Sequence, residues 1–476
     1  MTLKGMTLLD KLPWQSWQET ADTLVNRSLD RHLRLAVTGL SRSGKTAFIT
    51  ALVHQLEQAG FSARLPHWQV LQSGRLLGVR RVAQRNHHIP TFPYAEGLAA
   101  LHGEPPRWPD PTRTVSEIRL ELRFHSQHPL LRHLKRDASS LFLDIVDYPG
   151  EWLLDLPLLQ MSYAQWSEQV RAQLVEPSLA QSAADWLRQG SQLVLEAPCD
   201  DAALRGLAAS YTAWLHHCKS ELGLSLIQPG RFVLPGEYAG APMLQFVPWV
   251  WGPLAAQAVP GSLQAMLEER FAYYKQHLVQ GFYQQHFASF DRQIVLVDCL
   301  QPLQAGEPAF VDLQQTLALL MRSFHYGQSS WLRRLFAPRI DKLLFAASKA
   351  DHVTPDQHAN LQSLLRHLVQ QAYGVARFEG IDIECLPLAS VRACDYRQVS
   401  HEGRLIQALL GTNLAGESVH LFPGEVPARC PDARYWQGEN QFGFVALRPP
   451  HLPPDQTMPH LRLDQVLEFL LGDKLR

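Results

Sequence analysis

Apolar residues follow two patterns along this chain, and the two patterns alternate. Nearly continuous apolar runs, which are typical of buried parallel strands, occupy residues 33–37, 141–146, 293–298, 342–347 and 381–388. Residues 47–56 have apolar positions at helical spacing, whereas residues 115–124 alternate almost strictly, as in a half-exposed strand near a sheet edge. Strand-like runs separated by helical runs predict an α/β fold with a parallel sheet.

Two long segments interrupt this alternation. The first, between residues 57 and 114, is basic and contains prolines, and its pattern indicates only a loop or hairpin. The second, from about residue 152 to 290, is rich in Leu, Ala, Gln and Trp at helical spacing. We therefore predict a discontinuous α/β domain of residues 1–150 and 291–476, with residues 151–290 forming a large, mainly helical insertion.

The composition is that of a globular protein with more than one lobe. The chain has 476 residues, of which 46% are hydrophobic and 19% charged, and its formal net charge of −1 argues against a nucleic-acid partner. The six cysteines are scattered without a C-x-x-C pair, so reduced thiols are expected rather than disulfides or a zinc site. Since no signal-peptide pattern and no run of about 20 apolar residues is present, the sequence predicts a cytoplasmic protein.

Residues 39–46 read GLSRSGKT and match the spacing G-x-x-x-x-G-K-[ST]. The motif follows the first predicted strand and precedes the first predicted helix, which is the context in which such a loop binds phosphate. Its backbone N–H groups and the positive end of the helix dipole would hold phosphate oxygens, and Gly44 would let the backbone approach them closely. Lys45 would reach the β- and γ-phosphates, and the Thr46 hydroxyl would contact Mg²⁺. The sequence therefore predicts a nucleoside triphosphate site.

A second motif, D-x-x-G, ends the strand predicted at residues 141–146. A carboxylate that follows a buried strand can lie near Mg²⁺, and a glycine amide three residues later can sense the γ-phosphate. Asp147 and Gly150 are the candidates for these two roles. Asp144, three residues before Asp147, would lie on the opposite face of the strand and is expected to be structural.

The loop at residues 109–115 precedes another predicted strand and offers two hydroxyl groups. Either Thr112 or Thr114 would bind Mg²⁺ in the triphosphate state, and Arg113 between them would lie near the phosphates as an internal arginine finger. The alternative is a polar loop that merely opens the strand. Trp108, just before this loop, would either cover the nucleotide or pack in the core.

A fourth segment, Ser348-Lys349-Ala350-Asp351, follows the buried strand at residues 342–347. Asp351 can accept two hydrogen bonds from the N1–H and the exocyclic amine of guanine, a pattern that adenine does not offer. The stem of Lys349 can lie along the face of the base. Backbone groups at residues 388–393, after the next strand, would also touch the base.

The order of these motifs resembles that of the small regulatory GTPases, and residues 144–151 are particularly similar to the start of the Ras-type switch II segment. The full length, the GLSRSGKT loop, the DYPGEW segment and the predicted helical insertion resemble the bacterial YcjX stress-protein family. The resemblance implies a P-loop NTPase core of the Ras-like type, GTP and GDP as ligands with Mg²⁺, a role in envelope stress and a membrane-protein partner. It leaves peripheral attachment to the inner membrane open. One departure is Ser348, where many GTPases have Asn or Thr.

Motifs and resemblance together predict a Mg²⁺-dependent GTP-binding protein that hydrolyses GTP slowly and acts as a stress-response switch, with its partner on the helical insertion. Slow hydrolysis is expected because Glu151 stands where Ras-like enzymes commonly have Gln, and a carboxylate cannot donate a hydrogen bond to phosphate. Glu151 would either orient the attacking water or point outward on a switch surface. The alternatives are an ATPase of the same fold and a nucleotide-stabilised scaffold with negligible turnover.

The expected site residues fall into three groups. Residues expected to contact the nucleotide are Gly39, Ser41, Ser43, Gly44, Lys45, Thr46, Ala47, Thr112, Arg113, Thr114, Gly150, Lys349, Asp351, His352 and Val391. Those assigned to the metal are Thr46, Thr114 and Asp147. Those assigned to hydrolysis are Lys45, Glu151 and Arg113.

Overall fold

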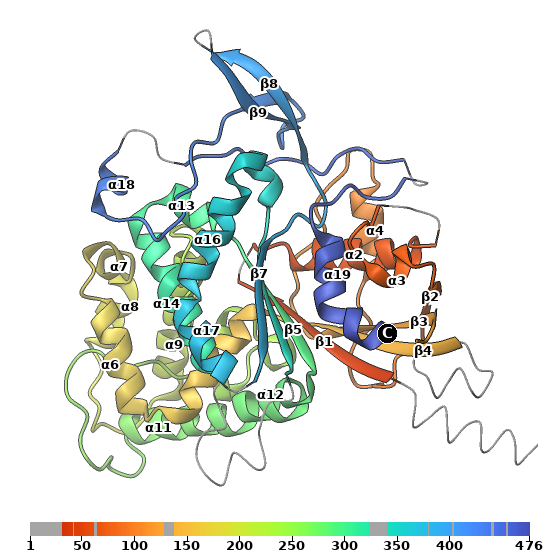
Figure 1. The fold of residues 1–476 in the computed structure, drawn as a ribbon. Coiled ribbons are helices and arrows are strands. Elements are labelled where there is room, and N and C mark those ends of the chain that lie inside the picture. Colours follow the sequence, from red (N-terminus) through yellow and green to blue (C-terminus); the bar gives the residue numbers. More distant parts are fainter. Residues whose placement is uncertain are drawn as a thin grey trace, which may run out of the picture.

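The fold is built on one large twisted sheet with helices on both faces (Figure 1). The computed structural model describes residues 31–40, 42–60, 64–127, 138–323, 340–378, 380–401, 404–438, 442–453 and 456–476. Within these residues, no helix is both long enough and apolar enough to cross a membrane.

Seven strands form the large sheet in the order β2-β3-β4-β1-β5-β6-β7. Strands β4, β1, β5, β6 and β7 are parallel, whereas β3 is antiparallel to both β2 and β4. The strands are β1 (Arg31–Gly39), β2 (Leu76–Val82), β3 (Ser116–His125), β4 (Ala138–Asp147), β5 (Arg292–Val297), β6 (Lys342–Ala347) and β7 (Asp382–Pro387). The predicted α/β class and its mainly parallel sheet are thus confirmed, and each apolar run of the sequence lies in a strand.

Strand β3 differs from its prediction as a half-exposed strand near an edge. It lies second from the edge, and all but two of its residues are buried. Three of its charged residues are buried, and two of these are paired on the sheet: Glu117 contacts Arg34, and Glu121 contacts Arg80. Alternation of apolar and charged residues therefore did not mean exposure here. The edge strand is β2, within the segment for which the sequence indicated only a loop or hairpin.

Two layers of helices cover the sheet. One face carries α2 (Lys45–Glu57), α3 (Gln69–Gln72), α4 (Tyr94–Leu101) and α19 (Leu463–Leu471), and the other carries α13 (Leu300–Ala305), α14 (Glu307–Ser323), α16 (His358–Leu368) and α17 (Gln370–Phe378) (Figure 1). Successive residues of the central strand β1 pack alternately against the two helix layers, because successive side chains of a strand point to opposite faces of the sheet. Leu35 packs in the first layer and Ala36 in the second.

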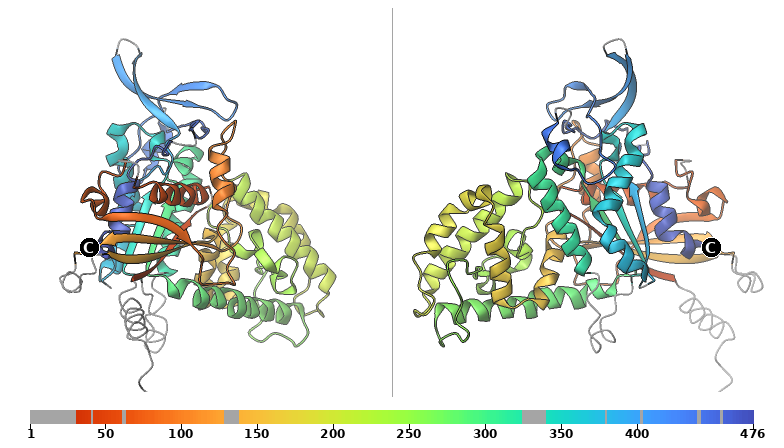
Figure 2. Two further views of the ribbon diagram at one scale, coloured as in Figure 1. Left: turned by 90° about the vertical axis from the view of Figure 1, so that its right-hand side faces the viewer. Right: turned by 60° about the vertical axis from the view of Figure 1, so that its left-hand side comes forward.

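The chain between β4 and β5 is mainly helical and stands to one side of the sheet (Figure 2). It begins with the 3₁₀ segment η1 (Gly150–Gln160) and continues with α6 (Tyr163–Gln173), α7 (Pro177–Ser182), α8 (Ala184–Gly190), α9 (Asp201–Ser220), α10 (Gly230–Val233), α11 (Leu263–Tyr274) and α12 (Gln280–Gln285). Its tryptophans Trp166 and Trp186 are almost fully buried, as expected of core residues. The helical segment shares one hydrophobic cluster with the adjacent face of the sheet.

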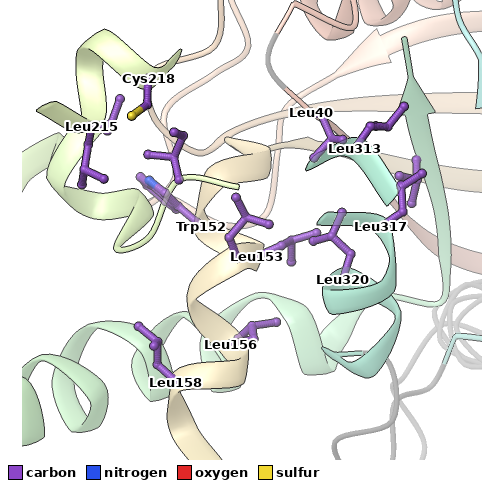
Figure 3. Close-up of a cluster of buried hydrophobic side chains, with 14 of the residues drawn as sticks. Leu40, Trp152, Leu153, Leu156, Leu158, Leu215, Cys218, Leu313, Leu317 and Leu320 are labelled. Atoms are coloured by element: carbon purple, nitrogen blue, oxygen red, sulfur yellow. The ribbon is translucent and has the colours of Figure 1, made fainter. Parts of the chain in front are cut away.

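Segment η1 lies in the middle of that shared cluster. Figure 3 shows Trp152 and Leu153 of η1 between Leu215 of α9 and Leu320 of α14. The segment that follows the D-x-x-G motif is therefore packed on both sides, against the helical segment and against a helix of the sheet.

A second, smaller sheet follows β7 and projects from one end of the molecule (Figure 1). Its antiparallel strands are β8 (Cys394–His401), β9 (Arg404–Thr412) and β10 (Ser418–Leu421), in the order β10-β9-β8. The short helix α18 (Ala433–Gln437) comes after it. The sequence pattern did not predict this sheet, because its strands carry no long apolar run.

Candidate functional site

The turn between β1 and α2 has the backbone shape of a phosphate-binding loop. Gly44 has φ 84°, in the left-handed region, and stands at the N-cap of α2, where its carbonyl accepts a hydrogen bond from Phe48 N–H at 2.9 Å. The first N–H groups of α2 have no partner within the helix, so they can bind an anion at the positive end of the helix dipole. Lys45 Nζ lies 3.3 Å from the carbonyl oxygen of Gly39. Ser41, predicted to contact nucleotide, lies outside the described residues.

Two glycines of separate motifs are in direct contact. A Cβ built on Gly150 would lie 2.1 Å from the carbonyl oxygen of Gly39, and a Cβ on Gly39 would lie 2.2 Å from Ser43 Oγ. Both positions therefore need glycine for space rather than for backbone conformation. The contact places the D-x-x-G segment directly against residues 39–46, which we call the phosphate loop.

A chain of oxygen atoms links three other predicted residues. Thr46 Oγ1 lies 3.3 Å from Thr112 Oγ1, and Thr112 donates a hydrogen bond of 2.5 Å to Asp147 Oδ2. Asp147 is only 2% exposed, and this burial raises its pKa to about 6. Thr114 is exposed and does not line the cavity described below. The geometry thus favours Thr112 over Thr114 as the threonine beside Asp147.

The side chain of Glu151 is buried, and the residue lines the cavity instead of pointing outward. Its Oε1 lies 2.7 Å from Nζ of Lys219, in the last turn of α9. Burial by itself raises the pKa of Glu151, but the positive charges of Lys45 and Lys219 hold it below its ordinary value. Glu151 is therefore an ionised, paired carboxylate.

The segment after β6 presents Asp351 to the same cavity. Asp351 Oδ2 accepts a hydrogen bond of 2.7 Å from Ala393 N–H, and His352 Nδ1 lies 3.2 Å from Asp351 Oδ1. Burial acts to raise the pKa of Asp351, but the His352 ring and the Ala393 N–H lower it below its usual value. Each carboxylate oxygen can accept more than one hydrogen bond, so both oxygens can still receive a ligand.

Lys349 is held in an unusual backbone conformation beside this carboxylate. It has φ 58°, and its Nζ lies 2.5 Å from Asp298 Oδ2, just after β5. The same ammonium group lies 5.9 Å from the centre of the Phe444 ring. These contacts fix the stem of Lys349 across one wall of the cavity.

One cavity of about 510 Å³ joins these segments, a size typical of small-molecule sites. The predicted residues that line it are Ser43, Gly44, Lys45, Thr46, Ala47, Thr112, Arg113, Glu151, Lys349, Asp351, His352 and Val391. Gly39, Asp147 and Gly150 are buried and do not line it. Residues dispersed over more than 300 positions of the chain thus meet at one site.

Several lining residues belong to no motif of the sequence. They include Lys219, Leu414, Phe444 and Leu447. No local pattern could have found them, because they reach the cavity only through the packing of α9 and of the chain after β7. Trp108, for which the sequence leaves two roles open, closes one side of the cavity, where its Nε1 donates a hydrogen bond of 2.8 Å to the carbonyl of Leu447.

The residues of this site fit a nucleoside triphosphate with Mg²⁺. Hydroxyl and carboxylate oxygens of Thr46, Thr112 and Asp147 are the hard donors that Mg²⁺ prefers. Asp147 Oδ1 receives no side-chain hydrogen bond within the described residues, and neither Ser43 Oγ nor Ser348 Oγ has any partner there. The phosphate loop and Asp351 line the same cavity.

Comparison with known proteins adds an independent finding. The sequence profile of the YcjX-like family, DUF463, matches residues 33–475. A protein of Escherichia coli (strain K12) named "Ras-like GTPase YcjX" is 56% identical over 461 residues, which cover 96% of this chain and 98% of that protein. A protein of the same name from Shewanella oneidensis (strain MR-1) is 43% identical over 475 residues, which cover 96% of this chain and 97% of that protein. The similarity therefore spans both the sheet and the helical segment.

Proposed function

Since this chain belongs to the YcjX-like family, we propose that it is a Mg²⁺-dependent GTP-binding protein that hydrolyses GTP slowly and acts as a stress-response switch. One observation carries the proposal. One cavity is lined by the phosphate loop, Thr112, Glu151 and Asp351, the groups expected to contact the phosphates, Mg²⁺, the attacking water and the base. The name of the two relatives supports GTP over other nucleotides.

In this proposal the phosphates bind at the N-terminus of α2. The first N–H groups of α2 would bind the anion, and Lys45 would exchange its contact with the Gly39 carbonyl for a charge-assisted bond to phosphate. Gly150, which lies against the Gly39 backbone, would sense the terminal phosphate through its N–H group. Ala47 and Arg113 complete this end of the cavity.

Mg²⁺ would be held by Thr46, Thr112 and Asp147, the last acting through water. When bound, the ion neutralises charge on the β- and γ-phosphates. The sequence pattern assigns this role to Thr114 with Thr112 as the alternative, and we propose Thr112 because of its hydrogen bond to Asp147. The short contact already positions the threonine hydroxyl at the carboxylate.

Guanine would be selected by Asp351, with the Lys349 stem against the base and with His352 and Val391 beside it. The carboxylate accepts from two donors on guanine, whereas adenine presents an acceptor at N1. An ATPase of the same fold is the competing function, and the competition titration described below distinguishes the two.

Hydrolysis would be slow because Glu151 offers a carboxylate in place of an amide. It can accept a hydrogen bond from water but cannot donate one to phosphate. Arg113 is exposed at the cavity and is available to supply positive charge on the phosphoryl group. If turnover were negligible, the protein would instead be a nucleotide-stabilised scaffold.

The switch would act through η1 on the helical segment, which we propose as an insertion of residues 151–290 within a domain of residues 1–150 and 291–476. Asp155 of η1 accepts hydrogen bonds from Gly230 N–H at 2.8 Å and from the Tyr274 hydroxyl at 2.5 Å. Movement of η1 after hydrolysis would therefore be transmitted to α10 and α11. A membrane-protein or stress-pathway partner would read that change on the helical segment.

A competition titration tests the nucleotide assignment. GTP and ATP are titrated, each with Mg²⁺, against a fluorescent guanosine diphosphate analogue bound to the wild-type protein. We expect GTP to displace the analogue at much lower concentration than ATP. Equal displacement by the two nucleotides would refute the guanine assignment, and failure of the analogue to bind would refute nucleotide binding.

A further inference from the structure

The ion pair between Lys219 and Glu151 connects the helical segment to the phosphate end of the cavity. The side chain of Lys219 is 21% exposed and that of Glu151 is 7% exposed, and their charged atoms are 2.7 Å apart. Both residues line the cavity, together with Lys45. We propose that Lys219 is a positioning residue for Glu151, supplied by α9, which keeps this carboxylate beside the reacting phosphate. The inference rests on the proposed function.

The physical need for Lys219 comes from charge. A carboxylate facing the γ-phosphate of a bound triphosphate would be repelled, and in a partly buried site the repulsion is weakly screened. Lys45 faces Glu151 from α2, but a bound triphosphate would engage that ammonium group. Lys219 would stay paired with Glu151 after Lys45 has bound the phosphate. Glu151 could then remain near the phosphate and accept a hydrogen bond from the attacking water.

The helix that carries Lys219 is well placed to hold it still. Trp214 and Leu215 of α9 are buried in the shared core, and Leu215 and Cys218 lie near Trp152, the residue after Glu151 (Figure 3). The C-terminal end of α9 also touches the phosphate loop, because Arg42 donates a hydrogen bond of 3.5 Å to the Ser220 carbonyl. A cation in the last turn of a helix is favoured by the helix dipole.

Backbone packing on the other side of Glu151 keeps the pair in place. A Cβ on Gly230 would lie 2.1 Å from the Glu151 carbonyl oxygen, so α10 is pressed against the backbone of Glu151. The next residue, Trp152, donates a hydrogen bond of 3.0 Å to the Leu234 carbonyl. The helical segment thus holds Glu151 by its main chain as well as by Lys219.

Single-turnover GTP hydrolysis and GDP affinity should be measured for Lys219→Met, Lys219→Arg, Glu151→Gln and the double variant Glu151→Gln/Lys219→Met. Arg205→Met is the matched control, since Arg205 is exposed on the same helix and does not line the cavity. We expect Lys219→Met to slow hydrolysis at least about tenfold while GDP affinity changes less than about threefold. Lys219→Arg should restore the rate to within a few-fold, because it keeps the charge.

The double variant separates positioning from a general effect on the fold. With an amide in place of the Glu151 carboxylate no charge needs neutralising, so adding Lys219→Met should change the rate by less than about threefold. If Lys219→Met does not fold, two other comparisons of the hydrolysis rate still test the role of Lys219. One compares the double variant with Glu151→Gln, and the other compares Lys219→Arg with wild type.

Different outcomes overturn different claims. An unchanged rate in Lys219→Met, or an equal loss in the wild-type and Glu151→Gln backgrounds, would overturn the role of Lys219 and leave the proposed function intact. If the wild-type protein binds GTP but releases no phosphate, the proposed hydrolysis is wrong and the role of Lys219 falls with it.

Discussion

Replacing Gly150 with alanine should separate the D-x-x-G segment from the phosphate loop. The new Cβ would lie 2.1 Å from the carbonyl oxygen of Gly39 and 2.9 Å from its carbonyl carbon. Ordinary van der Waals contact begins near 3.4 Å, so the two backbones would have to move apart by about 1.3 Å. Neither obstacle is a flexible side chain, and the strain cannot be relieved by a rotamer change.

Overpacking of this kind usually costs about 1–3 kcal/mol, and backbone obstacles favour the upper part of that range. We expect the free energy of unfolding of Gly150→Ala to fall by roughly 2–3 kcal/mol. Affinity for triphosphate should fall as well, because Gly39 is the first residue of the phosphate loop and displacement of its backbone would distort that loop.

Urea denaturation followed by tryptophan fluorescence measures the stability change, and calorimetry measures the affinity. Gly206→Ala is the matched control: Gly206 is exposed within α9, and a Cβ at this position would meet nothing within 4 Å. That variant should be neutral or more stable by up to about 1 kcal/mol, since alanine is the better helix former. A urea midpoint for Gly150→Ala equal to that of wild type would refute the close contact between the two motifs.

Three further predictions concern single side chains of the cavity. Thr112→Ala should weaken Mg²⁺-dependent triphosphate binding by about 1–3 kcal/mol in calorimetry, whereas the binding free energy of Thr114→Ala should stay within about 0.5 kcal/mol of wild type. A larger loss of binding in Thr114→Ala than in Thr112→Ala would assign the metal role to Thr114. Burial raises the pKa of Asp147 to about 6, so the ionised form of this carboxyl group is disfavoured in the folded state. The free energy of unfolding of the nucleotide-free protein should therefore fall as pH rises from about 4 to 6, by at most roughly 3 kcal/mol. The free energy of unfolding of Asp147→Asn, measured with urea across this pH range, should not show this fall. Identical pH dependence of stability in wild type and Asp147→Asn would refute the raised pKa of Asp147. Asp351→Asn should reduce the preference for GTP over ATP in competition titrations, and an unchanged preference would remove Asp351 from base recognition.

The sequence could predict those elements of the fold whose own residues form a recognisable pattern of apolar and polar positions. The strands that hold the loop, the D-x-x-G motif and Asp351 are buried and apolar, so each could be located from its own residues. Strand β2 could not, because its Leu77 is 49% exposed, it contains Gly78, and the strand is the exposed edge of the sheet.

The candidate site divides in the same way. The loop, Asp147 and Asp351 belong to motifs with fixed spacing, whereas the sequence offers Thr114 for the metal and leaves Thr112 open as the alternative. Only the hydrogen bond of Thr112 to Asp147 distinguishes them. Lys219 lies 68 residues from Glu151 along the chain, and the pair exists because α9 packs against η1. No spacing rule predicts such a contact.

Single-turnover release of phosphate from GTP tests the central claim most directly. Wild-type protein in excess over GTP, with saturating Mg²⁺, should release phosphate over minutes or longer, as unaided Ras-type enzymes do. Lys45→Ala should release none above background, because it loses the charge-assisted contact to the β- and γ-phosphates. Phosphate release by Lys45→Ala at the wild-type rate, or wild-type protein that holds GTP without cleaving it, would contradict the assignment as a GTPase.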